Sequence, residues 1–219
     1  MIGEQLNNLC KTLTIMDTEV HMVGELKVID PPHVMLIEVK THDGTPVFGC
    51  EGPGMVDVNK ILKMKIGAKE EFTTHFQDGK YILVNDEGKY QFQCCEVTEK
   101  LPKVPKLGDL NYVQVEKKPL EAFVNQASII SERIILVMEN GELRGRCEDD
   151  GVSLDRKLGT CDSYLEVVSM YPADYMKKIM KVVGPTLTIG LHTDWPMTIE
   201  WNDEYYNYKV LLAPRIERD

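Results

Sequence analysis

The sequence predicts an α+β fold in which one unit of helices and antiparallel strands occurs twice. A lysine-rich helical segment occurs in each half of the chain, preceded and followed by short strand patterns. The strands are separated by turn residues, and not by the long crossovers that parallel pairing needs. The order helix, strands, helix, strands returns after a proline-containing segment near the middle of the chain.

Bulk composition is that of a globular protein. The 219 residues are 43% hydrophobic and 27% charged, which allows one large domain or two that each bury a core. No run approaches the roughly 18 consecutive apolar residues of a membrane-spanning helix, and the first residues lack the pattern of a signal peptide. Six cysteines without CxxC spacing fit reduced thiols. A cytosolic protein without membrane partners is expected.

The first half begins with a helix. Leu6, Leu9 and Leu13 recur at helical spacing, which predicts a helix over Gly3–Leu13. Strands are predicted next on either side of a corner formed by an aspartate and two prolines, because proline excludes both helix and ladder bonding there. The segments are Glu25–Ile29, Asp30-Pro31-Pro32 and His33–Val39.

A second helix, with several lysines, is predicted over Met55–Ile66, after the breaker Gly52-Pro53-Gly54. Three short strands complete the first half, separated by turn signals that each contain a glycine. The predicted strands are Glu71–Phe76, Tyr81–Asn85 and Tyr90–Glu96, and the turns are Asp78-Gly79 and Glu87-Gly88.

Residues Thr98–Asp109 contain Pro102, Pro105 and Gly108 and are predicted to be an extended connector. The second half then repeats the order, with helices over Pro119–Ser131 and Pro172–Val183 and a turn at Glu139-Asn140-Gly141. The predicted domain boundaries are 1–97 for the first domain, 98–109 for the connector and 110–219 for the second domain.

The carboxyl-terminal segment Thr186–Asp219 combines a TDxP turn at Thr193, Asp194 and Pro196 with an LAPRIE ending at Leu212–Glu217. With these motifs it resembles the end of the archaeal and eukaryotic sliding clamps of the proliferating cell nuclear antigen family. Upstream, three further segments are similar to the family's first hairpin and to two of its helices, so the resemblance covers essentially the whole chain. They are Leu26–Lys40, Val56–Lys65 and Tyr171–Lys181.

The resemblance implies a ring, usually of three subunits, with sheets outside and helices lining a hole for duplex DNA. It implies a processivity factor with no enzymatic activity and no cofactor. Polymerases, nucleases and ligases would dock through short peptide motifs beside the connector, and a clamp loader would act on the ring. The expected location is the cytoplasm, at the nucleoid of an archaeal cell, or the host cell of a virus.

Two features depart from the family pattern. The first domain opens directly on its helix, without the usual preceding strand, and the Thr41–Gly54 loop is irregular. Relatives close the ring by joining a late strand of domain one to a strand of domain two, so the resemblance places subunit contacts at Lys89, Tyr90, Phe92, Cys94, Val152, Leu154, Arg156 and Leu158.

The net charge of −10 argues against a polyanionic partner, but lysines concentrate in segments 60–65 and 177–181. Diffuse lysine contacts to phosphate suit sequence-independent DNA binding, because they attract without fixing a register. The alternative is an ordinary solvated helix face. The candidate DNA-contacting residues are Lys11, Lys60, Lys63, Lys65, Lys177, Lys178 and Lys181.

The expected peptide pocket would hold apolar and aromatic anchors of a partner. For Ile29, Val34, Leu36 and Leu212 the alternative is ordinary strand core, and for His33 it is a hydrogen-bonded loop histidine. The candidate pocket residues are Ile29, His33, Val34, Leu36, Leu101, Val104, Pro105, Pro196, Leu212, Ala213 and Pro214.

Two other functional classes stay open. A clamp-derived adaptor or inhibitor would keep the peptide pocket without encircling DNA, which the short first domain favours. An enzyme would use an acidic cluster, although no calcium-loop spacing is present and the five histidines lack metal-ligand spacing, so no metal site is predicted. The cluster comprises Glu148, Asp149, Asp150 and Asp155.

Overall fold

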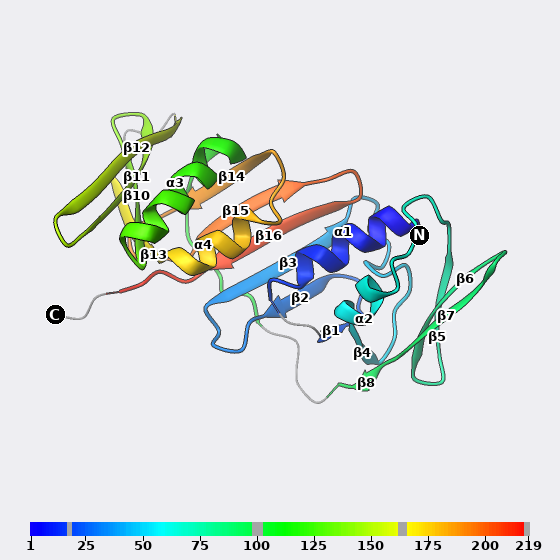
Figure 1. Ribbon diagram of the computed structural model, residues 1–219. Coiled ribbons are helices and arrows are strands. Elements are labelled where there is room, and N and C mark those ends of the chain that lie inside the picture. Colours follow the sequence, from blue (N-terminus) through cyan, green and yellow to red (C-terminus); the bar gives the residue numbers. More distant parts are fainter. Residues whose placement is uncertain (17–18, 98–102, 162–165, 217–219) are drawn as a thin grey trace. The chain divides into compact units, whose positions relative to one another are not determined.

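The computed structural model describes residues 1–16, 19–97, 103–161 and 166–216 (Figure 1). The chain divides into two compact units: unit 1 is Met1–Val104 with Asp203–Tyr208, and unit 2 is Pro105–Asn202 with Lys209–Asp219. This division falls inside the predicted connector and assigns a short late segment to unit 1. The predicted boundaries 1–97, 98–109 and 110–219 otherwise stay a prediction.

Helix α1 (Gly3–Leu13) of unit 1 has the predicted bounds. Its leucines are fully buried, whereas Lys11 is exposed on the opposite side. At the start of the helix, the amide of Gly3 donates to the carbonyl of Glu70 at 2.8 Å. This bond satisfies one of the donors that a helix start leaves unpaired, and it ties the helix to a distant segment.

The β2–β3 hairpin of unit 1 joins β2 (Leu26–Ile29) to β3 (Met35–Thr41). The second strand was predicted to begin at His33, but it begins two residues later. The reason is a turn in which the amide of His33 donates to the carbonyl of Asp30 at 2.8 Å, while His33 itself has a left-handed φ of +60°. The turn therefore ends in an exposed histidine.

A three-stranded antiparallel sheet in unit 1 has the order β1-β4-β8. Its central strand contains Met55, which was predicted to begin a helix. Met55 instead pairs with His21 on one side and Cys95 on the other. The strands are β1 (Glu19–His21), β4 (Gly54–Asp57) and β8 (Cys95–Glu96).

Helix α2 (Val58–Lys63) is therefore shorter than the predicted Met55–Ile66. Asp57 ends the strand and caps the helix, since its Oδ1 accepts hydrogen bonds from the amides of Asn59 (2.9 Å) and Lys60 (3.3 Å). Aspartate is among the preferred residues at this position, because its carboxylate satisfies free amides of the first turn.

The remaining sheet of unit 1 has the order β5-β6-β7. The predicted turn at Asp78-Gly79 is confirmed, with φ values of +50° and +71°, as a two-residue hairpin turn requires. The single strand predicted over Tyr90–Glu96 is wrong, because the run breaks at Cys94 and its last residues join β8. The strands are β5 (Thr73–Gln77), β6 (Lys80–Asn85) and β7 (Gly88–Gln93).

The residues before α1 form a short strand-like contact within unit 1. Ile2 forms an isolated antiparallel bridge with Glu71, and the backbones of Met1 and Phe72 exchange hydrogen bonds of 3.0 and 2.8 Å. The 42–53 loop contains no regular strand, as expected from its sequence. It is nevertheless fixed to the core, because the buried hydroxyl of Tyr81 donates to the carbonyl of Phe48 at 3.0 Å.

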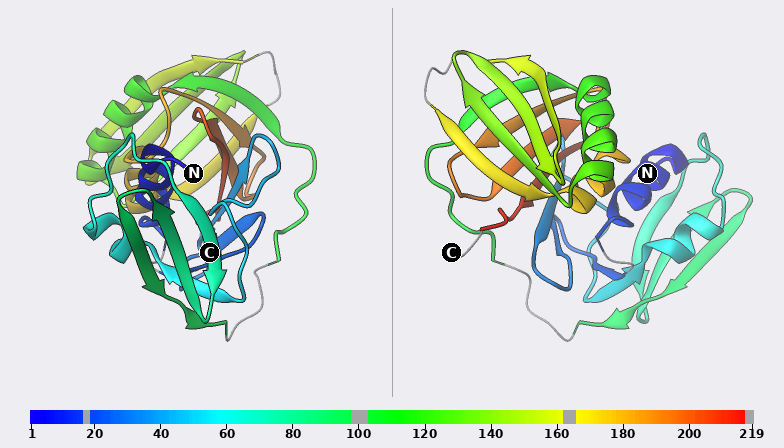
Figure 2. Two further views of the ribbon diagram at one scale, coloured as in Figure 1. Left: turned by 90° about the vertical axis from the view of Figure 1, so that its right-hand side faces the viewer. Right: turned by 60° about the vertical axis from the view of Figure 1, so that its left-hand side comes forward.

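Unit 2 contains a four-stranded antiparallel sheet, β12-β11-β10-β13, with helices α3 and α4 beside each other on one face (Figure 2). Gly145 of β11 lets α3 approach closely, because a Cβ at this position would lie 2.5 Å from the ring of Phe123. The elements are α3 (Lys117–Ile130), β10 (Arg133–Glu139), β11 (Glu142–Asp149), β12 (Val152–Thr160), β13 (Val167–Pro172) and α4 (Ala173–Met180).

The other strands of unit 2 follow the order β9-β14-β15-β16. Strand β9 was not predicted, although Val113 and Val115 alternate with exposed residues, as a half-buried strand requires. The first residues of β16 belong to unit 1, where the hydroxyl of Tyr206 donates to the carbonyl of Val47 at 3.0 Å. The strands are β9 (Asn111–Glu116), β14 (Thr186–Leu191), β15 (Met197–Asn202) and β16 (Tyr206–Leu212).

The element order confirms the repeated helix-and-strand pattern, and the described strand registers are antiparallel. The predicted turn at Asn140-Gly141 is confirmed by φ values of +51° and +76°. Helices α3 and α4 begin and end within three residues of their predicted bounds. Among the described residues, each helix is too short or too polar to cross a bilayer.

Candidate nucleic-acid interface and peptide-binding surface

The exposed side of the two packed helices of unit 1 carries the lysines predicted from the sequence. Helix α1 contributes Lys11, and α2 and the residues that follow it contribute Lys60, Lys63 and Lys65, all of them exposed. No acidic residue occurs between positions 58 and 65. Lys60 is partly neutralised, since its ammonium lies 3.6 Å from Asp57. The net positive charge of this face therefore comes mainly from the end of α2.

Lys65 has an unusual backbone conformation for a residue with a side chain. It follows the last turn of α2 with a left-handed φ of +52°, where glycine is the preferred residue. Its amide donates to the carbonyl of Leu62 at 3.2 Å. A lysine at such a position costs stability, and it adds a cation at the end of the helix.

In unit 2 the predicted lysines of α4 point away from the sheet. Ala173, Met176 and Ile179 are buried, while Lys177 and Lys178 are exposed. Lys181, the C-cap of α4, is also exposed. The ammonium of Lys178 lies 4.7 Å from the centroid of the Tyr175 ring, which favours one position of this charge.

A further exposed lysine of unit 2 was missed. Lys118 lies in the first turn of α3, which packs against α4. The prediction began this helix at Pro119, and so excluded both preceding lysines. Proline is favoured at the first helical position, which supports a start at Pro119, but in the structure Pro119 is the third residue of the helix. Lys117 is engaged differently, since its ammonium donates to the carbonyl of Val183 at 3.3 Å.

The β2–β3 turn presents the unit 1 part of the predicted peptide pocket. His33 is exposed at the turn, and Ile29 and Val34 are half-buried beside it. Leu36, however, is 4% exposed and belongs to the core. Its side chain is therefore not part of this surface.

The unit 2 part of the predicted pocket lies around the end of β16 and the Thr193–Pro196 turn. Pro196, Ala213 and Pro214 are half-buried, whereas Leu212 is fully buried and supports the surface from below. Of the connector residues, Val104 of unit 1 is half-buried, Pro105 of unit 2 is exposed, and Leu101 lies outside the described residues.

One strand of unit 2 holds both the turn and the chain after β16. On β13, the amide of Val168 donates to the Thr193 hydroxyl at 3.4 Å, and the carbonyl of Met170 accepts from the amide of Arg215 at 2.8 Å. Because Val168 and Met170 are two residues apart, their backbone groups point toward the same edge. The edge of β13 thus positions both segments.

The strands predicted to form subunit contacts are each paired on one side only within the described residues. Strand β7 pairs with β6, and β12 pairs with β11. Lys89, Tyr90, Val152, Leu154 and Arg156 are exposed or half-exposed. Two predicted contact residues, Phe92 and Leu158, are instead buried in their own units, since alternate strand residues point inward. Cys94, at the break between β7 and β8, is buried as well.

One member of the acidic cluster considered for a catalytic site, Asp155, is bound by two arginines. Asp155 of β12 accepts hydrogen bonds from Arg144 (2.8 Å) and Arg146 (2.9 Å) of β11. Burial opposes ionisation of Asp155, but the bonds from Arg146 and Arg144 outweigh it and lower its pKa. Within the described ranges, no group of three or more histidine, cysteine or acidic side chains is placed to hold a metal ion.

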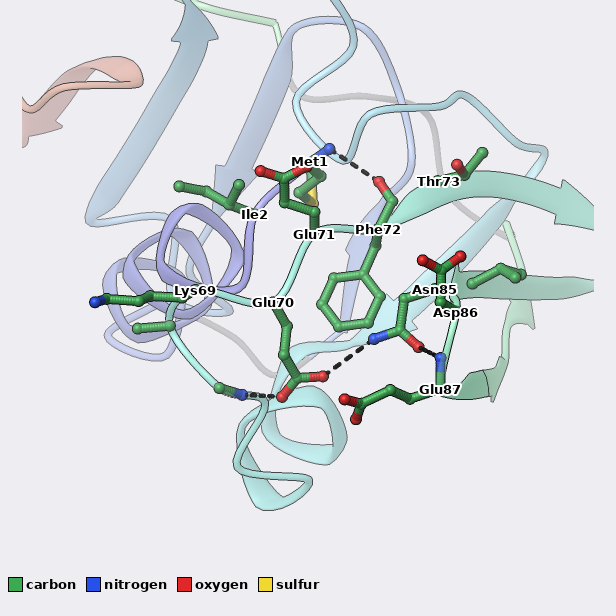
Figure 3. Close-up of a pocket in the computed structure, with 13 residues that line it drawn as sticks. Met1, Ile2, Lys69, Glu70, Glu71, Phe72, Thr73, Asn85, Asp86 and Glu87 are labelled. Carbon is green, nitrogen blue, oxygen red and sulfur yellow. Dashed lines mark hydrogen bonds between the residues drawn. The ribbon is translucent and has the colours of Figure 1, made fainter.

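A pocket of about 980 Å³ lies at the start of β5 in unit 1 (Figure 3). None of the predicted site residues lines it. Glu70, one of its acidic residues, accepts from the amide of Gly67 at 2.6 Å and from the Asn85 side chain at 3.3 Å, so this carboxylate fixes the surrounding loops. The other acidic residues at the pocket are Glu71, Asp86 and Glu87.

No family model matches the chain. A protein of Methanothrix thermoacetophila named DNA polymerase sliding clamp is 21% identical over 215 residues, which cover 89% of this chain and 86% of the relative. A protein of the same name from Pyrococcus horikoshii is 24% identical over 213 residues, covering 88% and 85%. This chain therefore spans most of the length of both relatives.

A solved structure has the same fold along the whole chain. It is the C-terminal region of FEN-1 bound to A. fulgidus PCNA, and the matching chain gives a TM-score of 0.85 at 21% identity. The match covers 100% of this chain and 98% of the other. The duplicated α+β architecture predicted from the sequence is thereby confirmed.

Proposed function

We propose, on the premise that the chain is a divergent PCNA-like sliding clamp, that it acts as a DNA polymerase processivity factor. The observation that carries this proposal is the position of the lysines. In each unit they are exposed on or next to a packed helix pair, and in unit 2 the other side of that pair contacts the four-stranded sheet. Such a surface attracts phosphates without reading bases.

In this role the protein encircles duplex DNA as a ring of three identical subunits. The edges of β7 and β12 that no described strand pairs with support ring closure, since an exposed strand edge is a template for pairing with another chain. The net charge of −10 is compatible with the role, because a negative outer surface repels DNA while basic helices attract it within the ring.

Partner enzymes dock at the predicted pocket residues of each unit, which lie at the β2–β3 turn in unit 1 and at the chain after β16 in unit 2, and at the connector. Supporting this part is the solved complex of A. fulgidus PCNA with the C-terminal region of FEN-1. The partners that we propose are DNA polymerase, the clamp loader, a nuclease and a ligase, each through a short peptide. The role is a scaffold without catalysis, performed in the cytoplasm at the DNA of an archaeal cell or of a virus-infected host.

The adaptor alternative is not favoured, because the relatives that cover most of the chain are named DNA polymerase sliding clamps. Light scattering over a concentration series distinguishes the two roles. We expect a mass near three times 24.9 kDa. A persistent monomer would contradict the ring.

Retention on DNA then tests encirclement directly. Protein loaded on a closed circular plasmid should remain bound in high salt and be released when a restriction enzyme linearises the plasmid, since a topological link does not depend on phosphate contacts. Equal release from circular and linear DNA would contradict encirclement, whatever the mass in solution.

A further inference from the structure

Trp195 is a large aromatic residue that the proposed function does not use. It lies in the turn between β14 and β15 of unit 2 and is 37% exposed. Its ring is 4.9 Å from the ring of His192, centroid to centroid, and its amide donates to the His192 carbonyl at 3.2 Å. Asp194, with a φ of +56°, turns the chain between them. The indole is thus held at the surface by its own turn.

Hydrogen bonds from β13 attach the same turn to the core of unit 2. The hydroxyl of the buried Tyr171 on β13 donates to the carbonyl of Trp195 at 3.0 Å. Burial raises the pKa of Tyr171 to about 12, so this hydroxyl keeps its proton at neutral pH. Together with the bond from Val168 to Thr193, this contact gives the turn two attachments to one strand.

The indole reaches the connector at Gly108. A Cβ placed on Gly108 would lie 3.0 Å from both Cζ3 and Cη2 of Trp195, which is tighter than ordinary contact. Gly108 is not among the glycines with a left-handed φ, so its backbone conformation does not require glycine. The close approach of the indole explains why a residue without a side chain is present here.

We propose that Trp195 is a positioning residue that latches the connector through Gly108 and thereby sets the affinity for a partner peptide. This inference rests on the proposed function, in which the connector borders the peptide surface. The described part of the connector, residues 103–109, forms no helix or strand of its own. A latch lowers the ordering cost of peptide binding, because the connector is already in place before the peptide arrives.

Trypsin measures the latch without any partner. Lys103 and Lys106 are exposed cleavage sites in the connector. We expect Trp195→Ala and Gly108→Leu to speed cleavage at these two sites by about fivefold or more, because proteolysis tracks local opening. Thermal melting should show that the variants remain folded.

Tyr112→Ala is the matched control. Tyr112 is 53% exposed, and its ring also covers a glycine, Gly190, which belongs to β14 and not to the connector. Its loss should leave cleavage at Lys103 and Lys106 unchanged. Unchanged cleavage in Trp195→Ala, or equal acceleration in Tyr112→Ala, would overturn the latch.

Peptide affinity tests the second part of the inference. The probe is a synthetic peptide that copies the C-terminal region of FEN-1 found in the complex with A. fulgidus PCNA, titrated by calorimetry. We expect Trp195→Ala and Gly108→Leu each to raise Kd by about fivefold or more. Faster trypsin cleavage with unchanged Kd would overturn the link to affinity. Failure of the wild type to bind would contradict peptide docking as well as this link, and the trypsin result would still decide the latch.

Discussion

The carboxylate of Asp30 accepts a hydrogen bond of 2.6 Å from the amide of Met35, across the base of the β2–β3 turn. Asp30 is 4% exposed, and its amide also donates to the carbonyl of Met35 at 3.0 Å. We expect Asp30→Ala to lower the free energy of unfolding by about 1–3 kcal/mol, since it leaves a buried amide without its acceptor. Asp30→Asn keeps an acceptor and should lose less. Equal losses in urea denaturation would show that this hydrogen bond does not stabilise the turn.

Reversing the charges of α4 should weaken DNA binding. In the triple variant Lys177→Glu, Lys178→Glu, Lys181→Glu, the negative slope of log affinity against log salt concentration should become shallower by about 3. The melting temperature should change little. The control variant Lys40→Glu, Lys103→Glu, Lys106→Glu makes the same change in net charge at exposed positions outside the helices. If both variants weaken DNA binding equally, the effect comes from net charge and not from α4.

Lys65 and Lys63 should respond oppositely to replacement by glycine. Lys65→Gly removes the backbone strain of a left-handed residue with a side chain, because glycine adopts this conformation readily. It should raise the free energy of unfolding by up to about 1 kcal/mol. Lys63→Gly places glycine in the last position of α2 and should lower it by roughly 0.5–1 kcal/mol. Urea denaturation measures both. A loss of stability in Lys65→Gly would contradict the predicted strain.

The ion pairs on β11 and β12 should make stability depend on acid pH. Hydrogen bonds from Lys157 and Arg144 lower the pKa of Glu142, and the pKa of Asp155 is lowered as well. A lowered carboxyl pKa stabilises the fold above the unfolded value of about 4, and this contribution is lost as pH falls through the folded value. The melting temperature of Asp155→Asn should therefore decrease less steeply with acidification than that of the wild type. Asp149→Asn makes the same change of charge on the same hairpin and is the control.

The chain after β16 should be required for partner binding. Ala213 is half-buried beside the Met170–Arg215 hydrogen bond, so Ala213→Asp places a charge where an apolar anchor of a peptide would bind. We expect at least a tenfold rise in Kd for the FEN-1 probe peptide, with an unchanged mass in solution. Thr186→Asp, at an exposed position of β14, is the control. Normal peptide binding by Ala213→Asp would place the pocket elsewhere.

Helical periodicity predicted the fold best where the helices are long and one face is fully buried. Helix α1 has its predicted bounds, because its leucines alone determine which face is buried. Helix α2 was predicted three residues too early at its start, since Met55 and Val56 fit the helical spacing as well as they fit a strand. Only the pairing of Met55 with His21 and Cys95 distinguishes the two, and such pairing is not visible in a single sequence.

Site residues were predicted by type and not by exposure. The lysines are exposed on the helices or at their ends, as expected. Leu36, Leu212, Phe92 and Leu158 are buried, because strand alternation depends on register, and Cys94 is buried at a strand break. Trp195 was missed, although the resemblance includes its turn, since its importance depends on contact with Gly108. Gly108 was interpreted only as a sign of an extended connector.

Strand β16 has a consequence for the order in which the protein matures during synthesis. Asp203–Tyr208 belongs to unit 1, and Tyr206 is fully buried there, hydrogen-bonded to a carbonyl 159 positions earlier in the chain. Domains generally fold as they emerge from the ribosome, with the amino-terminal one first. Unit 1 cannot complete its core in this way, because residues that fill it are translated after the helices and most strands of unit 2. The nascent first half must therefore wait, with part of its apolar surface uncovered, until β16 leaves the exit tunnel.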